Sequence, residues 1–335
     1  MTITRTILAT ALSLIAATQV ARADTPAFIA QPSIAGPDDH WDFASWDSEH
    51  HRVLVSHGKD VLVIDPAAGS VRSVGAIAGA HAALAIPGTS QILVTSAHDA
   101  SARVLDAGTG AELARIAVVG DPDATLLSAD GHTAYVMGGD SGAISVLDLT
   151  GRTETARIQL KPGLEVPVMP RPGLLAVNNE QLSEIELVDL VAGKAVGAIA
   201  LTGCEGPTGM AYAPEAGLSL STCANGKAAL VDLAARKLLA LLPIGAGPDT
   251  AIWDAARHRF LVPCGKSGSL SIIRLDGRKP VVEPAVKSEI GTRTGAFDPQ
   301  TGTLYLPTAK FAAAQAGKPK IVPGSFHVLV LKAAN

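Results

Sequence analysis

The chain has 335 residues, of which 47% are hydrophobic, and its 31 acidic side chains outnumber its 27 basic ones, for a net charge of −4. An acidic protein lacks the basic surface that non-specific nucleic-acid binding requires, so we expect no such binding. The length and the apolar content are sufficient for a sizeable folded core.

The first 23 residues have the features of an export signal. Arg5 precedes an apolar stretch at 7–17 that is too short to span a bilayer, and Ala21-Arg22-Ala23 fits a small-x-small cleavage site. We therefore expect a signal peptide at 1–23, cleavage after Ala23, and one mature domain at 24–335 in the periplasm or secreted. No second apolar segment has spanning length, so no membrane span is expected.

From about residue 40 onward, one pattern is repeated seven times. Each unit has a hydrophobic strand, a short polar turn and a second hydrophobic strand that ends in Asp before a Gly-bearing turn. Five units carry this residue at intervals of 41 to 43, as Asp65, Asp106, Asp148, Asp189 and Asp232. Arg274 and Val330 take its place in the last two units. A period near 42 without helices is typical of β-propeller blades.

The first unit shows how the strands are recognised. Residues 52–55 and 61–64 are short runs of Val, Leu and Ile on either side of the polar turn at 56–60. Their length excludes helices. One further strand follows each Asp and another opens the next unit, which gives four strands per unit. The predicted fold is an all-β, seven-bladed propeller.

The two ends of the chain are expected to close the ring. The seventh unit, at about 294–331, supplies only three strands, whereas residues 28–34 form a strand with no unit of its own. We predict that this N-terminal strand pairs with the last blade, which removes an open sheet edge. The alternative is a frayed N-terminal tail.

Three cysteines imply one disulfide and one free thiol in an oxidising compartment. Aligning the blades puts Cys223 and Cys264 at the same position of neighbouring blades, and Cys204 in the turn that leads into the blade of Cys223. This placement favours a Cys204–Cys223 disulfide and a buried, free Cys264. A Cys-based metal site is not expected, because no C-x-x-C spacing is present.

Polar side chains are predicted to converge at one end of the central channel, which we call the channel mouth. The residues that open the seven blades are Asp42, His81, Asp123, Glu165, Thr208, Asp249 and Arg293. If the opening strand is counted as the first of each blade, residues 52–55 belong to the second strand. The residues after the second strands are then His57, Ser96, Gly138, Asn179, Cys223, Cys264 and Thr308. Ligand sites of propellers cluster where blades converge. The predicted ligand-binding set is Asp42, His57, His81, Asp123, Glu165, Asn179, Asp249 and Arg293.

This set of carboxylates and imidazoles suits a divalent cation, the only cofactor that the sequence suggests. The candidate metal ligands are His57, His81 and Glu165. The alternative is structural: Asp and Thr hydrogen-bond to backbone N–H groups of turns, and Arg293 pairs with a neighbouring acid.

Two features near the predicted mouth stand out. Trp41 falls in a longer turn before the first blade and is expected to line the mouth, whereas Trp46 and Trp253 occupy core positions. The insertion at 310–324 in the seventh unit is the longest irregular stretch, and long loops of compact folds are often functional. Surface filler is the alternative for this insertion.

The sequence resembles the YncE-like family of secreted seven-bladed propellers with YVTN-type repeats. The segments that carry this resemblance are Trp46-Asp47, 52–58, 60–65, 204–209 with Cys223, 247–249, Asp298-Pro299, 304–309 and 321–326. Arg274 and the extra Cys264 depart from the family pattern. The resemblance implies the propeller fold, export and a binding or interaction role, and it transfers no catalytic residue.

Known catalytic motifs are absent from the sequence. It contains no G-x-S-x-G elbow, Gly-rich phosphate loop, H-E-x-x-H or C-x-x-C-H. The leading hypothesis is a non-catalytic module that binds a small ligand, a metal ion or a periplasmic protein at the mouth. The alternative is a metal-dependent hydrolase similar to sugar-lactone-hydrolysing propellers, with His57 or His81 as the general base. A quinone-dependent dehydrogenase ranks third, because those propellers use Trp-rich repeats and this chain has three Trp.

Overall fold

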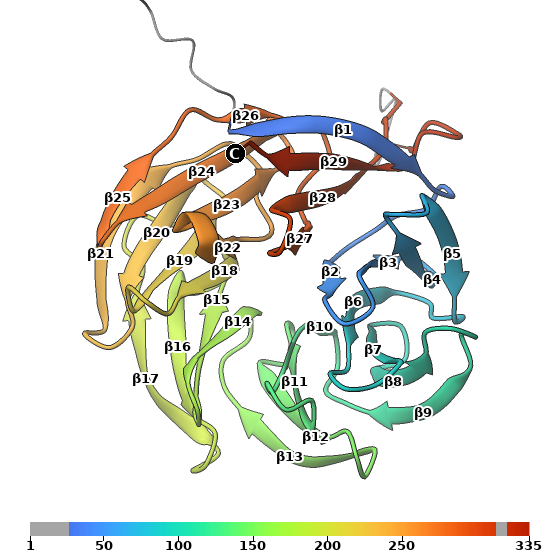
Figure 1. Cartoon of the computed structure of the whole chain (residues 1–335). Helices are drawn as coiled ribbons and strands as arrows, with labels where there is room; N and C mark the ends of the chain where they lie inside the picture. The colour runs from blue at the N-terminus through green and yellow to red at the C-terminus, as the bar shows by residue number, and fades with distance from the viewer. Residues whose placement is uncertain (1–26, 313–319, 335) are drawn as a thin grey trace, which may run out of the picture.

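The protein folds into a ring of seven antiparallel sheets around a central channel (Figure 1). The computed structural model describes residues 27–312 and 320–334. Apart from the 3₁₀ turn η1 (Ala255–Arg257), all regular elements of these ranges are strands, which confirms the predicted seven-bladed propeller. None of the described residues forms a helix that could cross a membrane. The predicted signal peptide at 1–23 lies outside the described residues.

Four strands build each blade, from the channel to the rim. The innermost strands are β2 (Ala44–Asp47), β6 (Ala80–Ala85), β10 (Pro122–Leu127), β14 (Leu164–Arg171), β18 (Pro207–Ala213), β22 (Ile252–Asp254) and β27 (Ala296–Asp298). The second strands are β3 (Arg52–His57), β7 (Gln91–Ser96), β11 (Thr133–Gly138), β15 (Leu174–Asn179), β19 (Leu218–Cys223), β23 (Arg259–Cys264) and β28 (Thr303–Thr308). The third strands are β4 (Asp60–Asp65), β8 (Ser101–Asp106), β12 (Ala143–Asp148), β16 (Glu184–Asp189), β20 (Lys227–Asp232), β24 (Ser269–Asp276) and β29 (His327–Ala333). The outermost strands are β5 (Ser70–Val74), β9 (Glu112–Ala117), β13 (Thr153–Gln159), β17 (Lys194–Ala200), β21 (Lys237–Pro243), β25 (Lys279–Val282) with the short β26 (Val286–Lys287), and β1 (Phe28–Ala35).

The repeated Asp ends the third strand because its carboxylate organises the following turn. Asp65 accepts hydrogen bonds from the backbone N–H groups of Ala67 and Ala68, at 2.9 and 3.0 Å. Such side-chain-to-backbone bonds stabilise turns, and the corresponding Asp of the next four blades makes the same kind of bond. In the sixth blade the third strand extends beyond Arg274, which instead pairs with Glu283 at 3.0 Å.

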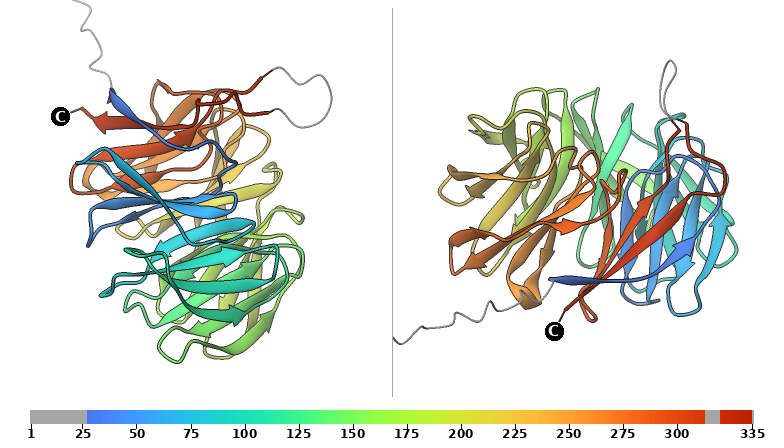
Figure 2. Two further views of the ribbon diagram at one scale, coloured as in Figure 1. Left: turned by 90° about the vertical axis from the view of Figure 1, so that its right-hand side faces the viewer. Right: turned by 90° about the horizontal axis from the view of Figure 1, so that it is seen from above.

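Apolar layers between neighbouring blades form the core. One such layer, between the fifth and sixth blades, contains Leu220, Phe260 and Val262, all fully buried. Each sheet is therefore covered on both faces by its neighbours, which explains the nearly continuous hydrophobic runs of the second and third strands. The left view of Figure 2 shows neighbouring sheets stacked against one another.

The N-terminal strand closes the ring, as predicted. β1 pairs antiparallel with β29, from Phe28 opposite Ala333 to Ala35 opposite His327. The seventh sheet thus has the order β1-β29-β28-β27, and Figure 1 shows the first strand lying beside the last one. The Phe28 side chain is 4% exposed, and the Arg259 guanidinium lies 4.7 Å from its ring centre.

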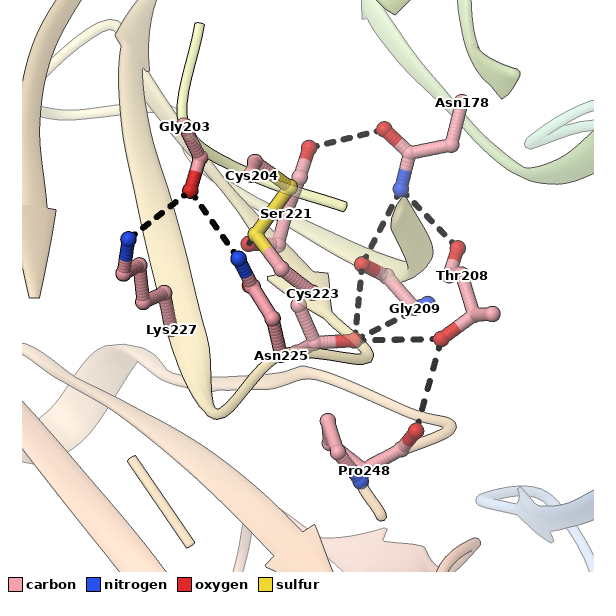
Figure 3. The surroundings of a disulfide bond; sticks show 11 residues. Asn178, Gly203, Cys204, Thr208, Gly209, Ser221, Cys223, Asn225, Lys227 and Pro248 are labelled. Carbon is pink, nitrogen blue, oxygen red and sulfur yellow. Dashed lines mark hydrogen bonds between the residues drawn. A yellow bond between two sulfur atoms is a disulfide. The ribbon is translucent and has the colours of Figure 1, made fainter. Parts of the chain in front are cut away.

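A disulfide joins Cys204 to Cys223, and Cys264 is free and buried, which confirms the predicted pairing (Figure 3). The bond ties the turn leading into the fifth blade to the end of that blade's second strand. Nearby, the buried Asn178 amide donates hydrogen bonds to the carbonyls of Thr208 and Gly209, at 2.9 and 3.1 Å. These bonds from the fourth blade fix the backbone that opens the fifth.

Candidate functional site

The innermost strands bring the seven blade-opening side chains to one end of the channel. His81, Asp123, Glu165 and Thr208 each occupy the second position of an innermost strand, and Asp42, Asp249 and Arg293 lie just ahead of one. The innermost strands surround the channel in Figure 1. All seven residues are neither fully buried nor fully exposed, as expected for a channel mouth.

Hydrogen bonds between neighbouring blades hold these openings in place. The Ser45 hydroxyl donates to the Ala83 carbonyl at 2.6 Å, which joins the first blade to the second. The Thr294 hydroxyl donates to the Asp42 carbonyl at 2.7 Å, which joins the seventh blade to the first. At these two blade boundaries, hydrogen bonds from side chains to carbonyl groups therefore hold the backbone next to Asp42 and His81.

Asp42, His81 and Asp123, from three successive blades, form a compact group that we call the mouth triad. The Nδ1 atom of His81 lies 3.2 Å from Asp42 Oδ2 and 3.1 Å from Asp123 Oδ1. Two atoms bound to one metal ion at about 2.1 Å lie roughly 3.0 to 3.4 Å apart in octahedral or tetrahedral geometry. Within the part of the chain that the structure describes, this is the one group of three or more ligand atoms close enough to share an ion.

Arg293 lies on the other side of Asp42 and bridges the sixth and first blades. Its guanidinium pairs with Asp249 and also donates to the Trp41 carbonyl at 2.9 Å, while Asp42 Oδ1 lies 3.4 Å away. Arg293 thus pairs with neighbouring acids, as in the structural reading of the sequence. It neutralises part of the negative charge of the mouth.

Carboxyl groups still outnumber cations at the mouth, and their pKa values reflect this excess. Burial, with the nearby charges of Asp123 and Asp249, raises the pKa of Asp42 to about 7, against the opposing effect of Arg293. Burial and the same two neighbouring charges raise the pKa of Glu165 to about 10. The hydrogen bond to Asp123 raises the pKa of His81. An added cation would therefore be stabilised here.

The comparisons with known proteins define the fold. No protein-family model matches the sequence, and no curated protein matches it. Hydrazine synthase of Kuenenia stuttgartiensis contains a chain with a TM-score of 0.72 and 16% identity, covering 88% of this chain and 96% of that one. A chain of the mitotic checkpoint complex has a TM-score of 0.75 and 14% identity, covering 99% of both chains. At this identity the likeness shows the propeller fold alone.

Two residues of the predicted ligand-binding set are engaged inside the blades. His57 is 2% exposed, its Nδ1 atom lies 3.0 Å from Asp60 Oδ1, and its ring lies 5.0 Å from that of Phe326. Asn179 is fully buried and donates to Glu186 at 2.9 Å and to the Pro162 carbonyl at 3.0 Å. Their burial and contacts support a structural role.

Two other residues at the ends of the second strands, Ser96 and Thr308, also make structural contacts. The Ser96 hydroxyl donates to the Ala78 carbonyl at 2.8 Å, and the Thr308 hydroxyl donates to the Ile290 carbonyl at 2.8 Å. Each bond holds the loop that leads into the residue's own blade. In these four blades the last residue of the second strand therefore serves blade construction, whereas the blade-opening residue lies at the channel mouth.

Of the three candidate metal ligands, His81 alone belongs to the mouth triad. His57 instead contacts Asp60 and Phe326, and Glu165 is not part of the group, although the charges of Asp123 and Asp42 help to raise its pKa. The two carboxylates of the triad come from the blade-opening positions on either side of His81. That shared position in adjacent blades was the sequence signal that could have selected them.

Proposed function

We propose that this propeller is an exported, non-catalytic binding module that holds a divalent metal ion at the channel mouth. The observation that carries the proposal is the mouth triad, in which one imidazole nitrogen lies within 3.2 Å of two carboxylate oxygens. The Cys204–Cys223 disulfide supports export, because disulfides persist in oxidising compartments. The resemblance to the YncE-like family agrees with export and with a binding role.

The ligand types favour a transition metal. Imidazole combined with carboxylate suits Zn²⁺ or Mn²⁺, whereas Ca²⁺ prefers oxygen ligands alone. His81 must lose its proton to bind the ion, and its pKa is raised by the bond to Asp123. Metal binding therefore releases a proton, and its affinity should rise with pH until His81 is neutral.

The test is titration of chelator-treated protein with Zn²⁺ and Mn²⁺, followed by calorimetry and thermal unfolding. We expect saturable binding and a rise in Tm that His81→Gln and Asp123→Asn both abolish. The matched control is His132→Gln, because His132 is exposed in a hairpin turn. Equal stabilisation of wild type and His81→Gln by the metal would contradict the proposal.

A metal-dependent hydrolase is the second candidate, and Glu165 is the observation that favours it. In the metal-free protein, with its pKa raised to about 10, this carboxyl keeps its proton at neutral pH, and a bound cation that lowers this pKa would bring Glu165 nearer the working range of a general acid. The test is a screen of lactones and esters with metal-loaded protein, with and without chelator. Chelator-sensitive turnover that Glu165→Gln removes would favour the hydrolase, and absence of turnover would leave the binding role.

A further inference from the structure

A cavity of about 430 Å³ opens beside the mouth triad at the same end of the ring. Loops of the fifth, sixth, seventh and first blades surround it. Its lining is Trp41, Ala224, 247–249, Gly265, Lys266, Ile290, Gly291, Arg293 and Phe311. This size lies within the range of small-molecule sites. We call it the aromatic cavity.

Aromatic and aliphatic side chains form its walls. The Trp41 ring is 8% exposed and lies 6.0 Å from the Phe311 ring, and Phe326 packs behind it at 5.4 Å. Phe311 and Ile290 are 38% and 57% exposed, although both are large apolar residues. Small-molecule sites are hollows lined mainly by apolar and aromatic side chains, so this lining suits a ligand.

The insertion of the seventh blade holds Phe311 in position. Its two arms pair at Phe311 and Ile321, and backbone bonds of 2.8 Å join Ala312 to Lys320 and Val322 to Lys310. Figure 2 shows these arms projecting from one face of the ring. From the sequence, this insertion could be either a functional loop or surface filler. In the structure it supplies one wall of the cavity through Phe311.

Gly291 allows Phe311 to lie close to the loop that leads into the seventh blade. Gly291 has φ of 102°, and a Cβ atom there would lie 3.1 Å from the Phe311 ring and 3.0 Å from Thr308 Oγ1. Any side chain would be strained in this backbone conformation, and its Cβ atom would require the Phe311 ring to shift slightly. Glycine therefore permits this close approach between Phe311 and the loop that leads into the seventh blade.

The charges of the aromatic cavity are opposite to those of the mouth triad. Lys266 and Arg293 border it, and the one acid in its lining, Asp249, is paired with Arg293. Within residues 27–312 and 320–334, no carboxylate lies within 4.0 Å of the exposed Lys266 ammonium. One uncompensated positive charge therefore remains at the rim.

We propose that the aromatic cavity binds a small aromatic carboxylate. The ring of the ligand stacks against Trp41 and Phe311, where offset or edge contacts between aromatic groups are favourable. Its carboxylate pairs with Lys266 at the rim. This site is separate from the proposed metal site, because it uses none of the three triad side chains.

The test is calorimetric titration with 2-naphthoate and with 2-naphthylmethylamine, which carries the same ring and the opposite charge. We expect naphthoate to bind with a Kd of about 1 mM or tighter, and the amine at least about tenfold more weakly. Lys266→Gln should remove most of that difference, and Phe311→Ala should weaken naphthoate at least about tenfold. Leu239→Ala is the matched control, because Leu239 is 43% exposed on the outermost strand β21.

The same variants separate this proposal from the metal site. Lys266→Gln and Phe311→Ala should retain Zn²⁺ and Mn²⁺ binding, and His81→Gln should retain naphthoate binding. No naphthoate binding, equal binding of the two probes, or an unchanged affinity in Phe311→Ala would each overturn the aromatic-carboxylate site. None of these results would bear on the mouth triad.

Discussion

Replacing Glu165 with glutamine should stabilise the metal-free protein at alkaline pH. Glutamine has nearly the shape of a protonated carboxyl group but cannot ionise. In the folded protein, burial and the charges of Asp123 and Asp249 raise the pKa of Glu165 to about 10, from an ordinary value of 4.5. Between these two values the folded state binds more protons than the unfolded state, so the contribution of Glu165 to stability falls as pH rises. The variant does not suffer this loss.

The size of the effect follows from the pKa shift. At pH 8 the loss is bounded at roughly 5 kcal/mol, since each pH unit above the ordinary carboxyl pKa costs about 1.4 kcal/mol. Glu165 keeps some contact with solvent, which screens its neighbours' charges. We therefore expect Glu165→Gln to be more stable than wild type by about 2 kcal/mol at pH 8 and nearly equal to it at pH 5.

Urea unfolding at pH 5 and pH 8, with a chelator present, measures the difference. The control is Glu215→Gln, because Glu215 is exposed in a hairpin turn on the opposite face. The reasoning would be refuted if Glu165→Gln gained no stability at pH 8. It would also be refuted if the gain were the same at pH 5, or if Glu215→Gln reproduced it.

Three further predictions concern the disulfide, the ring closure and the mouth. Replacing Cys204 and Cys223 by Ser should lower the free energy of unfolding by about 3 kcal/mol in urea unfolding, as for a loop of similar length, and reducing the wild type should have the same effect. Phe28→Ala should cost about 3 to 5 kcal/mol, because it removes a buried ring from the closing strand, whereas the exposed Gln31→Ala should cost under about 0.5 kcal/mol. Arg293→Gln should destabilise the protein more at pH 8 than at pH 5, because it removes the cation that lowers the pKa of Asp42; an equal loss at both values would contradict this.

Much of the fold could be predicted from the sequence because its determinants are local. The repeated Asp ends a strand through bonds to backbone groups two or three residues later, so the period near 42 is written directly into the chain. The closure by β1 could also be predicted from the sequence. The last unit lacks a fourth strand and the first strand of the chain belongs to no unit, so pairing the two leaves no open sheet edge. The pairing of Cys204 with Cys223 could be predicted because Cys204 lies in the turn that leads into the blade of Cys223.

The site could be predicted only in part. Blade counting selected the seven blade-opening residues, and each lies at the channel end of its blade. The same counting also placed His57 and Asn179 in the ligand-binding set at the mouth. Counting gives the position of a residue along the chain, but it does not give the direction of the side chain relative to the next sheet. Their burial between strands became visible only with the blades packed together.

The amino-acid sequence is enough to predict which strands form and how many blades they make, because both depend on apolar runs and turns within some 40 residues, and the ring closure follows from the strand count at the two ends of the chain. Tertiary structure alone decided that Asp42 and Asp123 approach His81 within 3.2 Å, and that Trp41 meets Phe311 across the closure. Those distances depend on the angle between adjacent sheets and on the packing of residues 270 positions apart in the chain. No local pattern encodes them.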